Sequence, residues 1–164
     1  LSVVCLTGAF ASGAATVHAA DGTLDFQVGK TIAYGDYFTT RMNIDGNNTA
    51  FCVQPMKKTP AAGTYSYDLL PKNSALRKAL YYLPADTGTK RRHPEQVLSG
   101  WSEDNCYVIG HLVTSYVYSG YDAGSGAFYG APQSYIDKAV ELANAIKGFA
   151  DPPSSFRALS SFRQ

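Results

Sequence analysis

Apolar and polar residues alternate along much of the chain between residues 24 and 55. Three runs combine β-branched and aromatic residues with polar neighbours: 24–28, 31–44 and 49–55. This period of two is typical of strands that bury one face. Gly46 lies in the segment 45–48, whose Asp, Gly and Asn residues suit a tight hairpin turn. The pattern predicts an antiparallel sheet, with Cys52 on or just after the second strand of a hairpin.

The second half of the chain changes to helical periodicity. Three segments carry apolar residues at three- and four-residue spacing: 73–83, 104–119 and 134–149. We expect Asp104 to cap the second of them, and Ser134 to form a capping box with Asp137 in the third. A strand is the alternative for 104–119, because its β-branched residues favour strands and Gly110 weakens a helix. The fold class we predict is α+β, a single domain with an N-terminal antiparallel β-sheet and a helical insertion of about three helices.

As a helix, the segment 104–119 has two neighbouring faces of different character. The apolar face carries Cys106, Ile109, Val113 and Val117. The more polar face carries Tyr107, His111, Ser115 (or Thr114) and Tyr118. His111 is therefore expected on the polar side of this helix.

The first twenty residues contain no charged side chain, begin apolar and end in small residues. Val17, His18 and Ala19 suit signal-peptidase cleavage after Ala19. We interpret 1–19 as a secretory signal peptide without its basic start, and 20–164 as the exported domain. The alternative is a hydrophobic N-terminal strand. Cys5 would leave with the signal peptide, so that the exported domain keeps two cysteines, which permits one disulfide.

The composition limits the classes of function. A chain of 164 residues, 45% of them hydrophobic, fits one domain with a core. With 14 basic and 13 acidic residues interspersed, the chain has no field that would favour nucleic acid. The basic run 90–93 is expected to be a solvated loop. Without metal-ligand spacing or a phosphate-loop motif, we expect no metal and no cofactor.

Cys52 and His111 are the residues most able to carry chemistry, and the pattern leaves three alternatives open. They can be the nucleophile and base of a cysteine hydrolase, in which histidine activates the thiol. Cys52 can instead form a disulfide with Cys106. It can also be an inert buried thiol, which is the common state of a free cysteine.

Four segments resemble, in order and spacing, the thioester domains of Gram-positive cell-surface adhesins: 50–55, 59–65, 76–82 and 107–118. The resemblance covers about 38–153, and Phe51, Cys52 and Val53 match the family's aromatic-Cys-aliphatic motif. In that family a cysteine thiol condenses with a glutamine carboxamide and releases ammonia. The resulting internal thioester can be attacked by a host amine, which leaves a covalent amide.

The resemblance also implies where the glutamine should lie. The family's helical motif is commonly Thr-Gln-x-Ala-aliphatic-Trp, whereas 110–115 reads Gly-His-Leu-Val-Thr-Ser, similar to a branch that carries His at this place. His111 cannot supply a carboxamide. The family's glutamine follows the last helix, which makes Gln164 the candidate and implies a domain truncated soon after it. Three other glutamines fit that place less well: Gln54, Gln96 and Gln133.

The function implied is an exported adhesin domain whose Cys52–Gln164 thioester captures amines on a host ligand. His111 would relay a proton, and Tyr107, Tyr116 and Tyr118 could exclude water. The implied partner is a host-surface protein or another amine-bearing ligand, bound once and covalently rather than turned over by an enzyme. The implied location is secreted and wall-anchored, with stalk and anchor domains elsewhere in the polypeptide. The alternatives are a Cys-His hydrolase or amidase and a structural adhesion module without a thioester.

Overall fold

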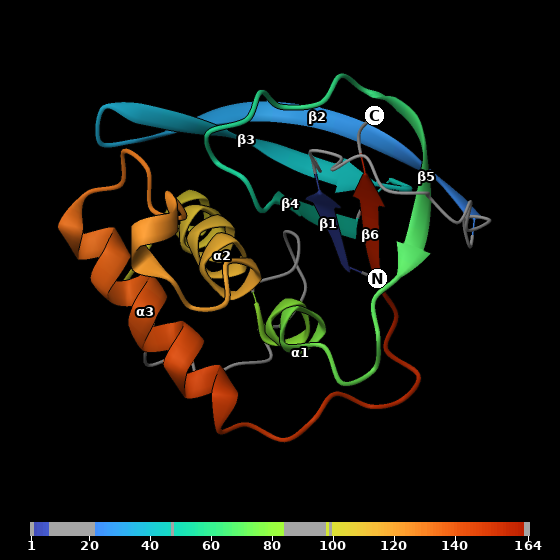
Figure 1. The fold of residues 1–164 in the computed structure, drawn as a ribbon. Helices are drawn as coiled ribbons and strands as arrows, with labels where there is room; N and C mark the ends of the chain where they lie inside the picture. The colour runs from blue at the N-terminus through green and yellow to red at the C-terminus, as the bar shows by residue number, and fades with distance from the viewer. Residues whose placement is uncertain (1, 7–21, 47, 84–97, 99, 163–164) are drawn as a thin grey trace, which may run out of the picture.

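Strands from both ends of the chain form a barrel, and helices from the middle pack beside it (Figure 1). The computed structural model describes residues 2–6, 22–46, 48–83, 98 and 100–162. The strands are β1 (Ser2–Leu6), β2 (Gly22–Tyr34), β3 (Tyr37–Ile44), β4 (Asn48–Cys52), β5 (Gly63–Leu69) and β6 (Ala158–Phe162). The helices are α1 (Ala75–Tyr82), α2 (Glu103–Tyr118) and α3 (Gln133–Lys147), with a single-turn helix at Ala123–Ser125. All of these helices lie between β5 and β6 in the sequence, which confirms the predicted α+β fold with a helical insertion.

The strands close in the order β1-β4-β3-β2-β5-β6, and β1 meets β6. The pairs β2–β3, β3–β4, β2–β5 and β5–β6 are antiparallel. The turn between β3 and β4 contains Asp45 and Gly46 with φ of 45° and 89°, as the turn composition predicts. Side chains from several strands fill the barrel: Leu24, Phe26, Met42, Ile44, Ala50, Cys52 and Leu159.

Strand β1 comes from the segment interpreted as a signal peptide. It pairs in parallel with both of its neighbours, so that Cys5 lies opposite Cys52 on β4 and opposite Ser161 on β6. This is the position that the N-terminal strand alternative requires. Cleavage after Ala19 would remove β1 from between β4 and β6, and it stays a prediction.

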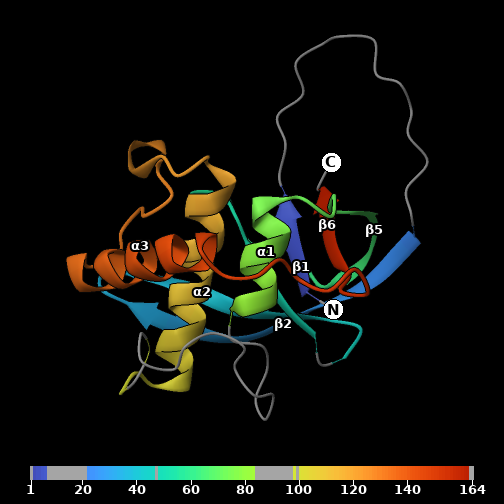
Figure 2. The ribbon, with the colours of Figure 1, turned by 90° about the horizontal axis from the view of Figure 1, so that it is seen from below.

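Helix α2 is the centre of the helical layer. It contacts α1 and α3 as well as β2 and β4, and its residues from Cys106 to Ser115 are all buried. Figures 1 and 2 show the helices grouped on one side of the barrel. A Cβ atom on Gly110 would lie 2.7 Å from Cε1 of Phe51, so α2 can approach β4 this closely only with glycine there. The residue that weakens the helix pattern in the sequence therefore sets the contact between helix and sheet.

A buried arginine fixes the chain where it returns from α3 to the barrel. Arg77 on α1 is 2% exposed, and its guanidinium donates to the backbone carbonyls of Lys72, Pro153 and Phe156. The guanidinium carbon also lies 5.5 Å from the centre of the Phe156 ring. One side chain thus satisfies the carbonyls of Pro153 and Phe156, directly before β6 begins, and ties them to Lys72 before α1.

Local details differ from the sequence-based expectations. The run 31–44 is two strands, because Gly35, with φ of 60°, and Asp36 turn the chain between β2 and β3. Ser102, rather than Asp104, caps α2. The capping box in the third helix is wrong, since α3 begins after Pro132 without a side-chain cap. The basic run 90–93 lies outside the described residues, and no described helix is long and apolar enough to cross a membrane.

Candidate functional site

Cys52 is the last residue of β4, at one end of the barrel. Its side chain is 5% exposed, and its Sγ donates to the backbone carbonyl of Gln54 at 3.5 Å. Burial raises the pKa of the Cys52 thiol above its ordinary value, because a thiolate loses hydration there. At neutral pH Cys52 is therefore a sheltered, protonated thiol.

Three residues of α2 at four-residue spacing face the strand that carries Cys52. The Tyr107 hydroxyl donates to the carbonyl of Ala50 at 2.7 Å and accepts from the amide of Met42 at 3.1 Å. One turn of helix further, His111 hydrogen-bonds to the backbone of Cys52. The Ser115 hydroxyl follows, 3.4 Å from the carbonyl of Cys52 but closer, at 2.9 Å, to that of His111. The polar face expected from the sequence is thus confirmed for Tyr107, His111 and Ser115. Their side chains contact backbone groups of the β3–β4 hairpin.

His111 is 3% exposed, and burial lowers its pKa from 6.5 to about 4. The hydrogen bond to Cys52 acts in the opposite direction and favours the charged ring, so its acceptor is the carbonyl oxygen. Nδ1 is buried and has no hydrogen-bond partner among the described residues. With a pKa of about 4, the imidazole is neutral at pH 7.

Cys52 and His111 line one cavity of about 430 Å³, which we call the Cys–His cavity. Tyr34, at the end of β2, joins them: its ring centre lies 6.4 Å from that of His111. Burial, and next the neighbouring Cys52, raise the pKa of the Tyr34 hydroxyl. The structure thus brings a thiol, a neutral imidazole and a protonated phenol to the same cavity.

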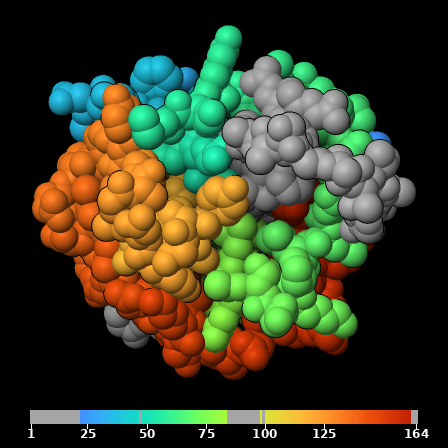
Figure 3. Space-filling view, viewed as in Figure 1, coloured from blue at the N-terminus to red at the C-terminus, as the bar shows by residue number. Residues whose placement is uncertain are grey.

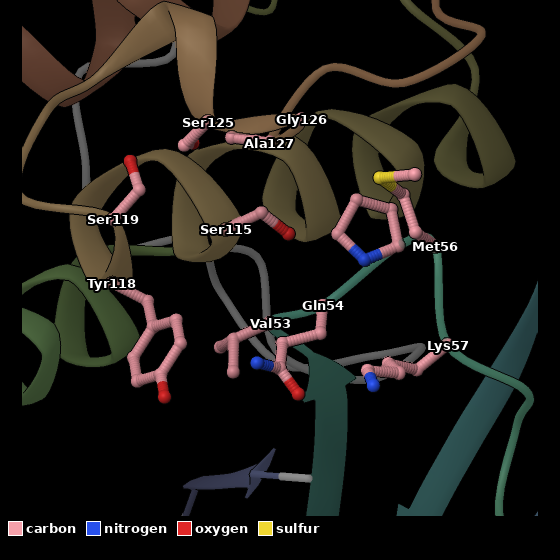
Figure 4. Close-up of a pocket in the computed structure, with 11 residues that line it drawn as sticks. Val53, Gln54, Met56, Lys57, Ser115, Tyr118, Ser119, Ser125, Gly126 and Ala127 are labelled. Atoms are coloured by element: carbon pink, nitrogen blue, oxygen red, sulfur yellow. The ribbon is translucent and has the colours of Figure 1, made fainter. Parts of the chain in front are cut away.

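A second cavity of about 300 Å³ lies on the other side of the segment that follows β4 (Figure 4). We call it the helix-side cavity. Ser115 and Tyr118 of α2, Ser119 directly after it and residues 125–127 face Val53 and Gln54 across it. Pro55 and Lys57 line both cavities, so the segment after Cys52 separates them.

Of the four glutamine candidates, Gln54 and Gln133 lie among the described residues. Gln164 and Gln96 lie outside the described residues. Gln54 lines the helix-side cavity, and Gln133, at the start of α3, donates to Asp137 at 2.8 Å. Strand β6 ends at Phe162, two residues before Gln164 in the sequence, and its Ser161 lies across β1 from Cys52.

The disulfide alternative is not observed, because Cys52 and Cys106 are both free thiols. Cys106 is buried in α2, with its Sγ 3.8 Å from the carbonyl of Trp101. Among the described residues there is no group of three or more His, Cys, Asp and Glu side chains that could hold a metal ion.

The expected wall of Tyr107, Tyr116 and Tyr118 is wrong in part. Tyr107 binds the barrel strands, Tyr116 packs against Tyr121 and Phe128, and Tyr118 lines the helix-side cavity. The three side chains contact different parts of the fold, so they do not form one wall around Cys52.

The tyrosines of the Cys–His cavity are Tyr34 and Tyr37, which the sequence analysis missed, together with Lys57 and Lys58. The lysines could have been found from the sequence, since they follow Cys52 within six residues. Tyr34 carries no such signal, because its position depends on how the barrel curves.

Comparison with known proteins supplies one match. A family model described as "Thioester domain" matches residues 23–153, which is most of the chain. No curated protein and no solved structure gives a significant match to the chain.

Proposed function

The chain belongs to the thioester domain family, and from that premise we propose that it is the adhesion module of an exported Gram-positive surface protein. Cys52 attacks the carboxamide carbon of a glutamine side chain, for which Gln164 is the candidate. A C–S bond forms, the C–N bond breaks and ammonia leaves. A ligand amine later attacks the thioester carbonyl, so that a C–N bond forms, the C–S bond breaks and Cys52 recovers its proton.

The observation that carries this proposal is the state of Cys52. A thioester stores an acyl group that water can hydrolyse, so it lasts only where bulk water is excluded. Cys52 is 5% exposed, yet it lines a cavity large enough to admit a ligand side chain. This combination of shelter and access suits a stored electrophile.

His111 supports the transfer of a proton during aminolysis. Its pKa of about 4 leaves the ring neutral at neutral pH, and Nδ1 has no hydrogen-bond partner among the described residues. An attacking amine must lose one proton, and the departing Cys52 sulfur must gain one. A neutral imidazole in the same cavity can carry that proton between them.

The proposed reaction occurs once per molecule. After aminolysis the former glutamine carbonyl is held in an amide, and an amide nitrogen is a much poorer leaving group than a thiolate. The module is therefore a covalent binder on the cell surface rather than an enzyme, and its partner is a host protein or another amine-bearing ligand.

The Cys-His hydrolase alternative receives less support from the geometry. Such enzymes need a reactive thiolate beside a histidine that accepts its proton. Here burial raises the pKa of Cys52 and lowers that of His111, and the histidine hydrogen-bonds to the Cys52 backbone. The Cys52 thiol itself donates to Gln54.

Intact mass spectrometry of the full-length protein tests the proposal. We expect a mass lower than that of the sequence by one ammonia, and a methylamine adduct after incubation. Cys52→Ala and Gln164→Ala should abolish both effects. Cys106→Ala is the matched control, because it removes the other buried free thiol and should change neither.

A mass that equals that of the sequence, with Cys52 titrating as a free thiol, would overturn the proposal. Repeated turnover of peptides or cell-wall fragments, lost in Cys52→Ala, would favour the hydrolase instead. If Cys52→Ala abolishes the thioester but Gln164→Ala does not, the family chemistry holds and the glutamine assignment is wrong.

A further inference from the structure

The Cys–His cavity is positively charged on its rim. Lys57 and Lys58 line it, and no Asp or Glu is among the described residues that do so. Neither ammonium group has a carboxylate partner among the described residues. Three other lysines are paired: Lys30 with Asp104 at 2.7 Å, Lys78 with Asp151 at 3.6 Å and Lys138 with Glu141 at 2.8 Å. With His111 neutral, the described cavity wall carries two positive charges and no negative one.

Exposed apolar side chains lie beside these lysines. Phe38, which lines the cavity, is 69% exposed, and Met56, between Pro55 and Lys57 of the cavity wall, is 64% exposed. Single exposed apolar residues are ordinary, but several around one reactive cavity indicate a contact surface. Figure 3 shows the blue β2–β3 end, the blue-green segment after β4 and the amber loop after α2 meeting on one face.

The rim is held in place rather than free. The hydroxyl of Tyr37 donates to that of Tyr129 at 3.1 Å, and the ring centres are 4.9 Å apart. A Cβ on Gly130 would lie 1.9 Å from the Tyr37 ring, so the ring packs directly on that backbone. The end of the β2–β3 hairpin is therefore fixed against the loop before α3, and a partner meets a preformed surface.

We propose that this rim selects amines presented by an acidic polypeptide segment, in which Asp or Glu residues flank the reactive lysine. The inference rests on the proposed thioester, since it names the class of partner that the same site accepts. The partner's carboxylates pair with Lys57 and Lys58, its apolar side chains contact Phe38 and Met56, and its lysine enters the cavity toward Cys52.

Charge gives this arrangement its selectivity. An amine in water is mostly a cation, and two lysines at the entrance repel it. Carboxylates beside the amine cancel that repulsion and add attraction. Asp36 lies in the turn next to Tyr37, but it does not line the cavity. The acidic groups needed to balance the two lysines therefore come from the partner.

Competing peptides test the inference on the full-length protein. Two acetylated peptides carry one lysine each, flanked by Glu in one and by Gln in the other. We measure the rate of adduct formation by intact mass and express each rate relative to methylamine. We expect about a tenfold preference for the Glu peptide at low salt, and a decline of this preference as salt screens the charges.

Charge variants distinguish the effect of Lys57 and Lys58 from that of the protein's overall charge. Lys57→Gln with Lys58→Gln should remove the preference, and Lys57→Glu with Lys58→Glu should reverse it. Both lysines are exposed, so the variants keep the fold. Lys72→Gln is the control, because Lys72 lines a different cavity and should leave the preference unchanged.

Equal rates for the two peptides, in a protein that does react with methylamine, would overturn this inference and leave the thioester proposal standing. A preference that survives in the double Gln variant would overturn it as well. Failure to react with methylamine or with either peptide would remove the proposed function, and the inference with it.

Discussion

Protonation of His111 should destabilise the fold in mildly acidic solution. The ring is buried, and its pKa falls from 6.5 to about 4 when the chain folds. Between these two values the unfolded chain binds a proton that the folded chain does not. Stability is therefore complete above pH 6.5, and it declines as the pH falls toward 4.

The size of the effect follows from the two pKa values. Each pH unit between them costs about 1.4 kcal/mol, and the decline is partial near its two ends. The free energy of unfolding should then fall by about 2 kcal/mol from pH 7 to pH 5, and by about 3 kcal/mol at pH 4. Since a domain of this kind is stable by only about 5–15 kcal/mol, a loss of this size is readily measured.

Urea unfolding at pH 7 and pH 5 measures this loss. His111→Gln removes the titrating group and retains an N–H that can donate to the Cys52 carbonyl. The variant has its own stability at pH 7, so the quantity to compare is the change between the two pH values. If the unmodified protein and His111→Gln lose the same free energy, His111 is not the titrating group and its assigned neutral state is wrong.

Three further substitutions follow from the same packing. Gly110→Ala brings a methyl group to 2.7 Å from the Phe51 ring, and overpacking of about 1–3 kcal/mol should exceed the helix gain of about 1 kcal/mol. Urea unfolding should show lower stability and mass spectrometry slower thioester formation; higher stability would contradict this. Arg77→Ala leaves buried carbonyls without a donor and should cost about 3 kcal/mol in urea unfolding, whereas a loss under about 1 kcal/mol would contradict their burial. Tyr34→Phe removes a hydroxyl that lines the cavity with Cys52 and can donate to the oxyanion formed when an amine attacks the thioester, so methylamine addition should slow about tenfold with little change in stability. An unchanged rate would show that this hydroxyl makes no such donation.

The strands that the sequence predicts best are those with a buried inner face and a turn of clear composition. The β3–β4 hairpin is one of these, because alternation and the Asp45–Gly46 turn agree. Two other features cannot be predicted from the local sequence. The turn after Gly35 is hidden because aromatic residues continue the strand-like pattern on both sides of it. Strand β6 is five residues long, and its partners β1 and β5 are far away in the sequence.

The candidate site also contains residues that the sequence predicts and residues that it does not. Cys52 and His111 could be found because each lies in a periodic element, and their pairing depends only on α2 packing against β4. Tyr34 needs the curvature of the barrel, which brings the end of β2 toward the end of β4. Gly110 could be read from the sequence only as a weak point in a helix, since the ring that requires it comes from a strand fifty-nine residues earlier.

Helix α2 links the stability of the fold to the chemistry proposed for Cys52. Its side chains bind the β3–β4 hairpin through backbone groups, namely the amide of Met42 and the carbonyls of Ala50 and Cys52. The backbone of the reactive strand is thereby fixed, while the Cys52 side chain makes no bond to the helix that would have to break before acylation. A rigid backbone, with a thiol whose described hydrogen bond goes to the nearby Gln54 carbonyl, favours repeated encounter of the sulfur with the same acyl carbon. Substitutions on this face of α2 should therefore change unfolding free energy and thioester yield together, whereas changes at Lys57 or Lys58 should alter only the choice of partner.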